Sequence, residues 1–364
     1  MKKLLTYLKH QPIAILLVFL PLAILAEMTD WGAIWVFALS AVAVIPMAGY
    51  IGEATESLAH YTGPRIGGLL NATLGNAAEL IITIFAIREG LLDLVKASII
   101  GSILGNLLLV LGMSMLLGGL RHGAQKFDRR QAGHNSVLLV MTVLTLLVPS
   151  LFSHSIGNID PPSPQVEALS LGVAGVMIIL YALGLIYSLR TVESPLTVEE
   201  TGHVNAVSHW PLRTAIIVLG LSTVGVAFLS ELLVGSVEPV VEALGISEFF
   251  IGIIFIPIIG NVAEHLVALQ VALKNQMTLS VEIAIASSLQ IALFVAPVLV
   301  FVSLLFGHHL TLTFDQFELL ALIAGVMIAA LVSADGESNW LEGAELLAIY
   351  IILGLAFFLL PVVM

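Results

Sequence analysis

The sequence predicts an all-α membrane protein with eleven transmembrane helices: one additional N-terminal helix followed by two inverted five-helix repeats. Three observations lead to this prediction: the apolar composition, the spacing of apolar windows, and a short acidic phrase that occurs twice. Of 364 residues, 59% are hydrophobic and 10% are charged, and the mean hydropathy is +1.07. Soluble domains carry about 25% charged residues, so an ordinary globular domain is excluded. The absence of cysteine excludes disulfides and thiolate metal ligands.

Apolar windows give the number of spans. A helix needs about twenty apolar residues to cross the hydrocarbon core of a bilayer. Eleven windows near this length follow one another along the chain, at 12–28, 31–51, 66–88, 94–118, 135–153, 167–189, 212–232, 247–272, 281–306, 318–334 and 341–363. No small-residue cleavage site follows the first window, so it is predicted to stay in the protein as a helix.

The lysines and arginines predict the orientation, because basic residues accumulate in cytoplasmic loops. With the N-terminus inside, only Arg88 and Lys96 fall outside. The predicted cytoplasmic set is Lys2, Lys3, Lys9, Arg65, Arg121, Lys126, Arg129, Arg130, Arg190, Arg213 and Lys274. We therefore expect a cytoplasmic N-terminus and an external C-terminus. A bacterial inner membrane is the expected location, since no organelle-targeting segment is recognised.

An internal repeat predicts the domain organisation. The phrase GNAAE ends at Glu79 and GNVAE ends at Glu264, an offset of 185 positions (264 − 79). The same offset pairs Glu53 with Glu238, Gly67 with Gly252, and Ser102 with Ser287. The predicted units are an N-terminal helix at 1–28, a first repeat at 29–190 with its motif at 67–106, a cytoplasmic linker at 191–211, and a second repeat at 212–364 with its motif at 252–297. Five spans per repeat make the repeats inverted, which brings Glu79 and Glu264 together near the bilayer midplane.

These two glutamates are the first candidates for a functional site. A carboxylate in the middle of a membrane costs about 2.5 to 3.5 kcal/mol on the insertion scale, so intramembrane acids are functional candidates by default. Asn76 and Asn261 precede them by three positions, which is the same face of a helix. The remaining candidates are Ser102 with Asn106 and Ser287 with Gln290 on the following helices, and Gly75, Gly260 and Pro257 as helix breaks that free backbone carbonyls.

Such a set of oxygen atoms suits a hard cation. Ca²⁺ takes six to eight oxygen ligands in a flexible shell, whereas Mg²⁺ gives up its water reluctantly. Zinc and copper favour thiolates and several imidazoles, and here His265 is the one histidine near the acids. Burial disfavours charged carboxylates unless a cation or protons neutralise them. The site is therefore predicted to hold protons or a divalent cation, and the empty, doubly charged form is costly.

Four phrases resemble the α-repeats of the calcium/proton antiporters, also called the cation/proton exchanger family. They are GGLLNATLGNAAEL at 67–80, KASIIGSILGN at 96–106, GNVAEH at 260–265 and ASSLQIALFVAP at 286–297. The resemblance implies a secondary transporter of Ca²⁺ and H⁺ that works by alternating access and is not an enzyme. By motif it also implies that Glu79 and Glu264 bind the cation and the protons. No cofactor is expected besides these transported ions, and the expected surroundings are a lipid bilayer without nucleic acid.

Several alternatives stay open from the sequence. A sodium- or potassium-coupled calcium exchanger, or another cation/proton antiporter, uses similar acids. An intramembrane metalloenzyme is a candidate of a different class, because Glu264 and His265 resemble a fragment of a metal site, although no His-Glu-x-x-His motif occurs. His265 itself is predicted to pack or to be fixed by hydrogen bonding, since neighbouring helix positions face different ways. The sequence gives neither the stoichiometry nor the oligomeric state, and a homo-oligomer is left open.

Overall fold

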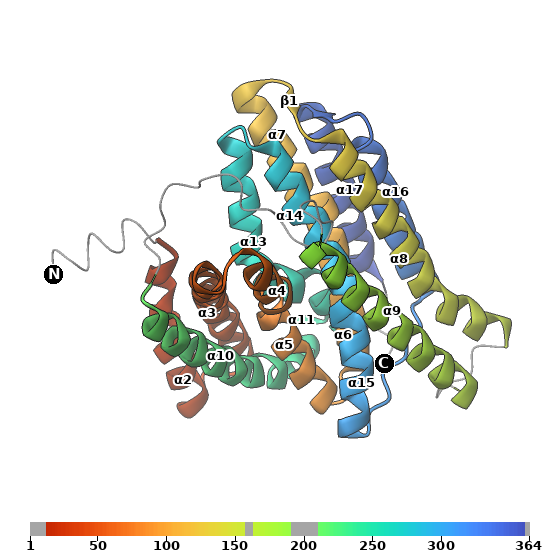
Figure 1. The fold of residues 1–364 in the computed structure, drawn as a ribbon. Helices are drawn as coiled ribbons and strands as arrows, with labels where there is room; N and C mark the ends of the chain where they lie inside the picture. Colours follow the sequence, from red (N-terminus) through yellow and green to blue (C-terminus); the bar gives the residue numbers. More distant parts are fainter. Residues whose placement is uncertain (1–11, 157–162, 191–209, 361–364) are drawn as a thin grey trace.

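The computed structural model describes residues 12–156, 163–190 and 210–360. Most of the predicted linker at 191–211, and the basic residues Lys2, Lys3 and Lys9, lie outside the described residues. The described chain is helical, with a single short ribbon of two strands (Figure 1). Its helices are long and apolar, as a helical membrane protein requires.

The elements follow the order of the apolar windows. They are η1 (Pro12–Val18), α2 (Phe19–Met28), α3 (Ala33–Thr62), α4 (Pro64–Leu74), α5 (Ala77–Arg88), α6 (Leu92–Leu104), η2 (Gly105–Val110), α7 (Leu111–His122), β1 (Gln125–Lys126), α8 (Arg129–Ser155), α9 (Pro164–Arg190), α10 (Leu212–Gly235), α11 (Val237–Leu244), α12 (Glu248–Phe250), η3 (Ile251–Phe255), α13 (Ile256–Leu273), α14 (Met277–Gln290), η4 (Ile291–Val295), α15 (Ala296–Phe306), α16 (Gln316–Val332), β2 (Glu337–Ser338) and α17 (Trp340–Leu359).

Among the described residues, eight helical stretches are long and apolar enough to cross a membrane. Each coincides with one of the predicted windows. The other three windows lie on shorter elements: the apolar helices Ile13–Met28 and Gln316–Val332, and the pair α4 and α5, which is interrupted at Gly75 and Asn76. The all-helical membrane architecture is therefore established, while the count of eleven spans stays a prediction.

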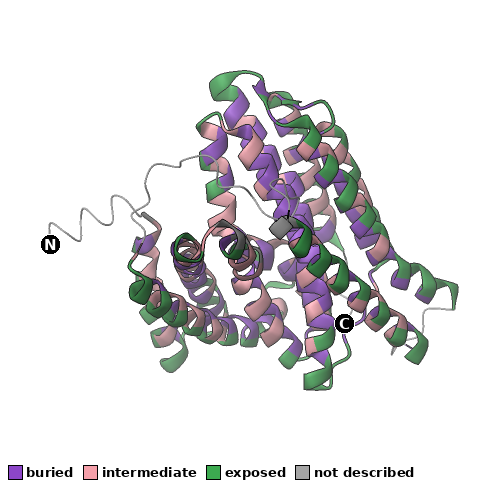
Figure 2. Cartoon of the chain, viewed as in Figure 1, coloured by how far each residue is buried: buried purple, intermediate pink, exposed green. Residues whose placement is uncertain are grey.

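The helices differ in how much protein surrounds them. In the most apolar window of the stretch Leu92–His122, 83% of the residues are buried, against 22% in Pro164–Tyr187 and 17% in Trp340–Leu359. Figure 2 shows the same contrast, with buried residues in the centre of the bundle and exposed ones along its outer helices. Since large apolar side chains remain exposed on these outer helices, lipid is the solvent that suits their surface.

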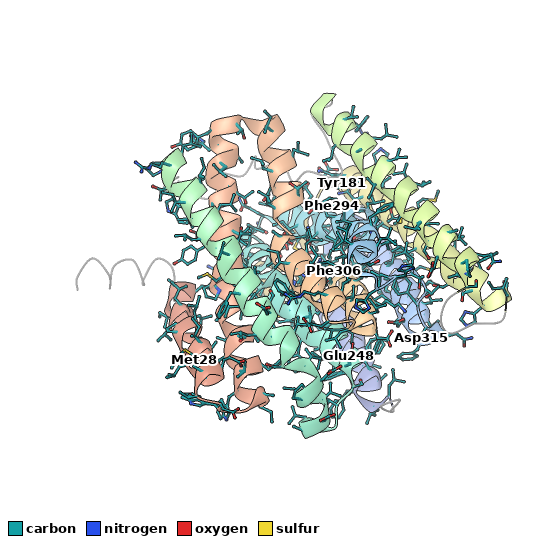
Figure 3. The ribbon with its side chains drawn as sticks, turned by 90° about the horizontal axis from the view of Figure 1, so that it is seen from below. Met28, Tyr181, Glu248, Phe294, Phe306 and Asp315 are labelled. Atoms are coloured by element: carbon teal, nitrogen blue, oxygen red, sulfur yellow. The ribbon has the colours of Figure 1, made fainter. Side chains whose placement is uncertain are left out.

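Two groups of helices flank the centre. Helices α2, α3 and α10 gather on one side, where α3 also contacts α5 and α13, and α10 contacts α5 (Figure 1). Helices α8, α9, α16 and α17 lie on the other side. There α9 packs on the central helices, and Tyr181 of α9 stacks on Phe294 with ring centroids 5.0 Å apart (Figure 3).

Three loops contact one another at one end of the bundle: 123–128 before α8, 274–276 after α13, and 333–339 before α17. We call this group of loops the clasp. Strand β1 pairs antiparallel with β2, placing Gln125 opposite Ser338. The buried Gln125 side chain donates hydrogen bonds to the Ala272 carbonyl (3.1 Å) and to Asn275 Oδ1 (2.9 Å), just after α13. Asn275 adopts a left-handed backbone, with φ of +63°. The clasp thus ties the loop that follows α13 to the loops before α8 and α17.

The acidic stretch 335–345, whose role the sequence leaves open, has a structural explanation. Its first part forms β2, and Asp335 accepts a hydrogen bond from the backbone N–H of Glu337. Asn339 and Glu342 form a capping box that begins α17, each side chain accepting from the other residue's backbone. Capping of this kind satisfies N–H groups at a helix start that have no partner within the helix.

Candidate functional site

The two repeated phrases place their glutamates in different local settings. The helix that carries the first phrase stops at Leu74 and resumes at Ala77, so Glu79 lies in the first turn of α5. The partial positive charge of that helix start favours a carboxylate. Glu264 lies inside the continuous helix α13. Glu79 is only 1% exposed, whereas Glu264 is partly exposed.

Each glutamate accepts a hydrogen bond from a serine on the helix that follows it. Ser102 of α6 donates to Glu79 Oε1, and Ser287 of α14 donates to Glu264 Oε2 at 2.7 Å. Both pairs are separated by 23 residues. A hydroxyl group both donates and accepts, so the serine can stay bonded to the carboxyl group whether it is charged or protonated.

The two phrases also contact each other crosswise. Asn261 Nδ2 lies 3.3 Å from Glu79 Oε2 and 3.1 Å from the carbonyl of Pro257. A Cβ atom placed on Gly260 would lie 3.3 Å from Glu79 Cβ, and one placed on Gly75 would lie 2.9 Å from Glu264 Oε1. Each glutamate therefore packs against the glycine of the opposite phrase, and the glycines permit this approach because they lack a side chain. The phrases meet in space, as the repeat predicts.

Amide side chains surround the two acids. Asn76 does not bond to Glu79 on its own helix face but donates to Gln290 Oε1 at 2.7 Å. Asn106 Nδ2 donates to Ser287 Oγ at 3.1 Å, which links Asn106 to Glu264. The eight side chains predicted for the site thus form three hydrogen-bonded groups: Ser102, Glu79 and Asn261; Asn76 and Gln290; and Asn106, Ser287 and Glu264.

Two buried acceptors in this region have no partner in the described chain. Asn76 and Asn261 are each 1% exposed, and the Oδ1 atom of each makes no hydrogen bond. Leaving such an atom unsatisfied costs about 1 to 3 kcal/mol. In the described part of the chain, no group of three or more His, Cys, Asp or Glu side chains could hold a metal. The region therefore offers two carboxyl groups and two free amide oxygens, which suits an ion with hard oxygen ligands.

The prediction that Gly260 breaks its helix is wrong. Helix α13 continues without interruption through Gly260, whose role in the structure is the close approach to Glu79. The irregular backbone lies earlier, in the π-helical turn η3 that ends just before Pro257. Proline lacks an N–H donor, so a loosened turn before it accommodates the missing hydrogen bond. The interruption between α4 and α5 spans Gly75 and Asn76, but Gly75 keeps a helical backbone (φ −55°, ψ −43°), and the departure from helical geometry is at Asn76 (φ −93°, ψ 17°).

Two further π-helical turns follow the site serines, and neither was predicted. Turn η2 begins at Gly105, after Ser102, and η4 begins at Ile291, after Ser287. Such turns are rare and often mark functional sites. His265 was predicted to pack or to be fixed by hydrogen bonding, and its ring Nε2 lies 3.2 Å from Asn106 Oδ1, a partner that the sequence did not predict. Together with the bonds of Asn106 to Ser287 and of Ser287 to Glu264, this hydrogen bond connects the His265 ring to the Glu264 carboxyl group.

Comparisons with known proteins agree with the geometry. The family described as sodium/calcium exchanger protein matches residues 32–190 and 214–359, which lie one in each predicted repeat. The chain is 44% identical over 364 residues to the Ca(2+)/H(+) antiporter of Aphanothece halophytica, covering 96% of each chain. It is 45% identical over 344 residues to the Ca(2+)/H(+) antiporter ChaA of Bacillus subtilis (strain 168), covering 93% of this chain and 96% of the relative.

A solved structure shares the fold. The structure of native YfkE superposes with a TM-score of 0.83 at 42% sequence identity, and the match covers 96% of this chain and all of that one.

Proposed function

Because the chain belongs to the sodium/calcium exchanger protein family, we propose that it exchanges Ca²⁺ for H⁺ across a membrane as a secondary active transporter. The observation that carries the proposal is the crosswise meeting of Glu79 and Glu264, each bonded to a serine and packed against the opposite glycine. Relatives that match almost the whole chain are named as Ca²⁺/H⁺ antiporters.

The cation form of the site follows from the available oxygen atoms. Glu79 and Glu264 contribute carboxylate oxygens, and Asn76 and Asn261 contribute the two Oδ1 atoms that lack a hydrogen bond. These six atoms reach the lower limit of the six to eight oxygens that Ca²⁺ takes, and the serine hydroxyls are nearby. A bound Ca²⁺ would neutralise both carboxylates and satisfy both amide oxygens.

The proton form follows from the same carboxyl groups. Without Ca²⁺, two buried negative charges in a low-dielectric region repel each other and lose their hydration. One proton on each glutamate removes both charges, and Ser102 and Ser287 can then accept where they had donated. The site with Ca²⁺ and the site with two protons are both neutralised, whereas the site without either carries two buried negative charges and is unfavourable. Exchange is therefore obligatory if only a neutralised site can switch sides.

The proposed architecture is that of an inverted-repeat transporter with eleven spans. The repeats are residues 29–190 and 212–364, joined by the linker 191–211 and preceded by the helix at 1–28. Support comes from the equal spacing of the two serine–glutamate pairs and from the π-helical turn after each serine. Movement of one group of helices against the other would give access from alternate sides.

The proposed location is a bacterial inner membrane with the N-terminus in the cytoplasm. In the structure, Arg121, Lys126, Arg129 and Lys274 lie in or beside the loops of the clasp. Arg88, predicted to be external, is the last residue of α5 and pairs with Glu231 at 3.2 Å. This separation favours the orientation that the basic loops predict.

The test is transport by the purified chain in liposomes. A pH gradient should drive uphill ⁴⁵Ca²⁺ uptake with an opposing proton flux, and Glu79→Gln and Glu264→Gln should each abolish it. Glu27→Gln, at an exposed position on α2, is the matched control and should transport normally. Unlabelled manganese, sodium and potassium serve as competitors.

The outcomes separate the alternatives. Uptake that follows a sodium or potassium gradient, without proton flux, would assign a sodium- or potassium-coupled exchanger. Intact transport by both glutamine variants would refute the site. Downhill movement alone would indicate a channel.

A further inference from the structure

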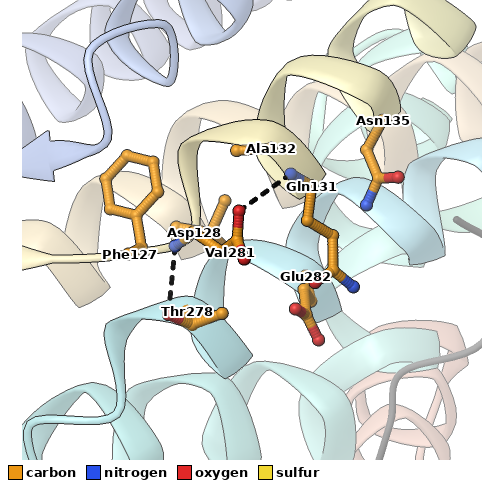
Figure 4. Close-up of a pocket in the computed structure, with 8 residues that line it drawn as sticks. All are labelled: Phe127, Asp128, Gln131, Ala132, Asn135, Thr278, Val281 and Glu282. Atoms are coloured by element: carbon orange, nitrogen blue, oxygen red, sulfur yellow. Dashed lines mark hydrogen bonds between the residues drawn. The ribbon is translucent and has the colours of Figure 1, made fainter. Parts of the chain in front are cut away.

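A second group of oxygen-bearing side chains lines a hollow between α8 and α14, apart from the two glutamates (Figure 4). The hollow encloses about 170 Å³, including the part that opens to solvent, and it is too narrow for a free water molecule as it stands. Its polar lining is Asp128, Gln131, Asn135, Thr278 and Glu282, and its apolar lining is Phe127, Ala132 and Val281.

Asn135 is the side chain that points to a ligand. It is only 2% exposed, it lines the hollow, and its Oδ1 atom makes no hydrogen bond. A rotation of the amide group by 180° exchanges its oxygen and nitrogen positions, so either atom can face the hollow. A buried amide oxygen without a hydrogen bond costs about 1 to 3 kcal/mol, a cost that a ligand in the hollow would remove.

Glu282 provides the second observation. It is 8% exposed, in the second turn of a helix that continues into the membrane, where acids are costly and are functional candidates. It precedes Ser287 by five positions, and five residues at 100° each turn the helix by about 140°, so the two side chains face different ways. Glu282 therefore faces α8 and belongs to a site separate from Glu264.

The remaining ligands lie at the mouth of the hollow. Asp128 begins α8, and its Oδ1 atom accepts hydrogen bonds from the backbone N–H groups of Arg130 and Gln131. The Thr278 hydroxyl accepts one from the backbone N–H of Asp128 at 3.3 Å, which holds the starts of α8 and α14 together. The neighbouring Arg129 guanidinium donates to the Ala334 carbonyl, away from these acids.

We propose that this hollow is a second binding site for a divalent cation, of the Ca²⁺ type, at the end of the bundle that carries the clasp. The lining supplies two carboxylates, two amide groups and one hydroxyl, and Ca²⁺ accepts all three kinds of oxygen at 2.3 to 2.6 Å. These distances are shorter than those of hydrogen bonds to water, which suits a narrow hollow. The lining contains no imidazole or thiolate, which disfavours zinc and copper.

A cation bound in this hollow would connect two helices, one of which carries residues of the exchange site. If the basic loops are cytoplasmic, the site samples the cytoplasmic cation pool. An ion shared by Asp128 and Glu282 would hold α8 against α14, the helix that carries Ser287 and Gln290 of the exchange site. Cation binding in this hollow does not depend on exchange at the two glutamates, so the two proposals can fail separately.

Equilibrium ⁴⁵Ca²⁺ binding to the purified full chain tests the proposal. The double variant Glu79→Gln, Glu264→Gln removes the exchange site, and it should still bind one Ca²⁺ per chain. In that background, Glu282→Gln and Asn135→Leu should each weaken the remaining affinity at least about tenfold. Asn135→Asp should strengthen it, because a third carboxylate raises calcium affinity. Glu345→Gln, which removes an exposed charge at the same end of the bundle, is the matched control and should change nothing.

The unmodified chain gives an independent count. It should bind two Ca²⁺ ions, and Glu282→Gln should reduce the number to one at the same concentration. Thermal unfolding in detergent identifies any variant that does not fold, and Asn135→Asp keeps the original size at that position. The proposal is refuted if the double variant binds no Ca²⁺ up to about 10 mM, well above the ~1 mM of weak calcium modules. It is equally refuted if Asn135→Asp and Glu282→Gln leave the affinity unchanged.

Discussion

The substitution Gly75→Ala tests the crosswise contact between the two acidic phrases. Its new Cβ atom would lie 2.9 Å from Glu264 Oε1 and 2.8 Å from the carbonyl oxygen of Asn71. Ordinary contacts of a Cβ atom begin near 3.4 Å, so the carboxyl group must retreat by about 0.5 Å (3.4 − 2.9). Glu264 Oε2 is held at 2.7 Å by Ser287, so this retreat strains or breaks that hydrogen bond.

The expected effect on transport follows from the tolerance of a calcium site. Ca²⁺–oxygen distances span 2.3 to 2.6 Å, a range of about 0.3 Å, which is smaller than the displacement. A 1 Å misplacement can cost about 100-fold in rate, so we expect Gly75→Ala to raise the KM for Ca²⁺ or lower the rate about tenfold, equal to about 1.4 kcal/mol. Gly260→Ala should be milder, because its Cβ would meet Glu79 Cβ at 3.3 Å.

The assay is the dependence of ⁴⁵Ca²⁺ uptake on Ca²⁺ concentration in liposomes. Gly52→Ala, on α3, is the matched control, because a Cβ there would meet nothing within 4 Å. Protein amount and thermal unfolding in detergent separate a transport effect from misfolding. The reasoning is refuted if Gly75→Ala transports as well as Gly52→Ala, since the glutamate would then not depend on the space that Gly75 leaves.

Three further predictions concern the site and the clasp. Ser287→Ala should reduce transport about tenfold or more by removing the hydrogen bond to Glu264. Ser288→Ala loses only a bond to Ala284 within its own helix and should transport normally. Equal loss of transport in both variants would contradict this prediction. Gln125→Leu should lower the free energy of unfolding by about 1 to 3 kcal/mol, since two buried hydrogen bonds disappear, while Lys126→Ala, in an exposed ion pair, should change it by less than about 1 kcal/mol. Lowering the pH on the side where Ca²⁺ binds should raise its KM, because a protonated carboxyl group ligates Ca²⁺ poorly; a KM that is independent of pH would argue against shared carboxyl groups.

The sequence predicted the acidic centre of the site because a carboxylate in an apolar window is a strong signal. A repeated phrase added the second strong signal, since Glu79 and Glu264 share a frame at a fixed offset. The order of the apolar windows and the same offset then placed Ser102 and Ser287 on the following helices, where they do bond to the acids. These inferences needed only the cost of buried charge and the geometry of a helix.

Other features could not be predicted, because they depend on partners that are distant in the sequence. Gly260 was expected to break its helix, but the glycine of a helix is also tolerated where another chain segment comes close, and only the position of Glu79 distinguishes the two roles. Asn76 was expected to share a helix face with Glu79, but the sequence gave no sign that its amide nitrogen bonds to Gln290, 214 residues away. Glu282 gave no motif, and its burial becomes meaningful only when α8 lies against α14.

The two halves of the site are similar but not equivalent. At the repeat offset, Gln290 corresponds to Gly105 and Asn106 corresponds to Ile291, so each repeat supplies one amide that the other lacks. Asn261 therefore donates to Glu79 across the repeats, whereas Asn76 is engaged by Gln290 and leaves Glu264 to its serine.

This inequality has a consequence for exchange. Glu79 is buried and accepts two side-chain donors, while Glu264 is partly exposed and accepts one from Ser287. In this arrangement Glu264, which is partly exposed, is the better placed of the two to receive a proton from solvent. If the two repeats are inverted, as proposed above, a switch of sides would have to reverse the exposure of the two acids while keeping their unequal donors. A proton or a cation that enters from one side of the membrane would then contact a different glutamate first than one that enters from the other side.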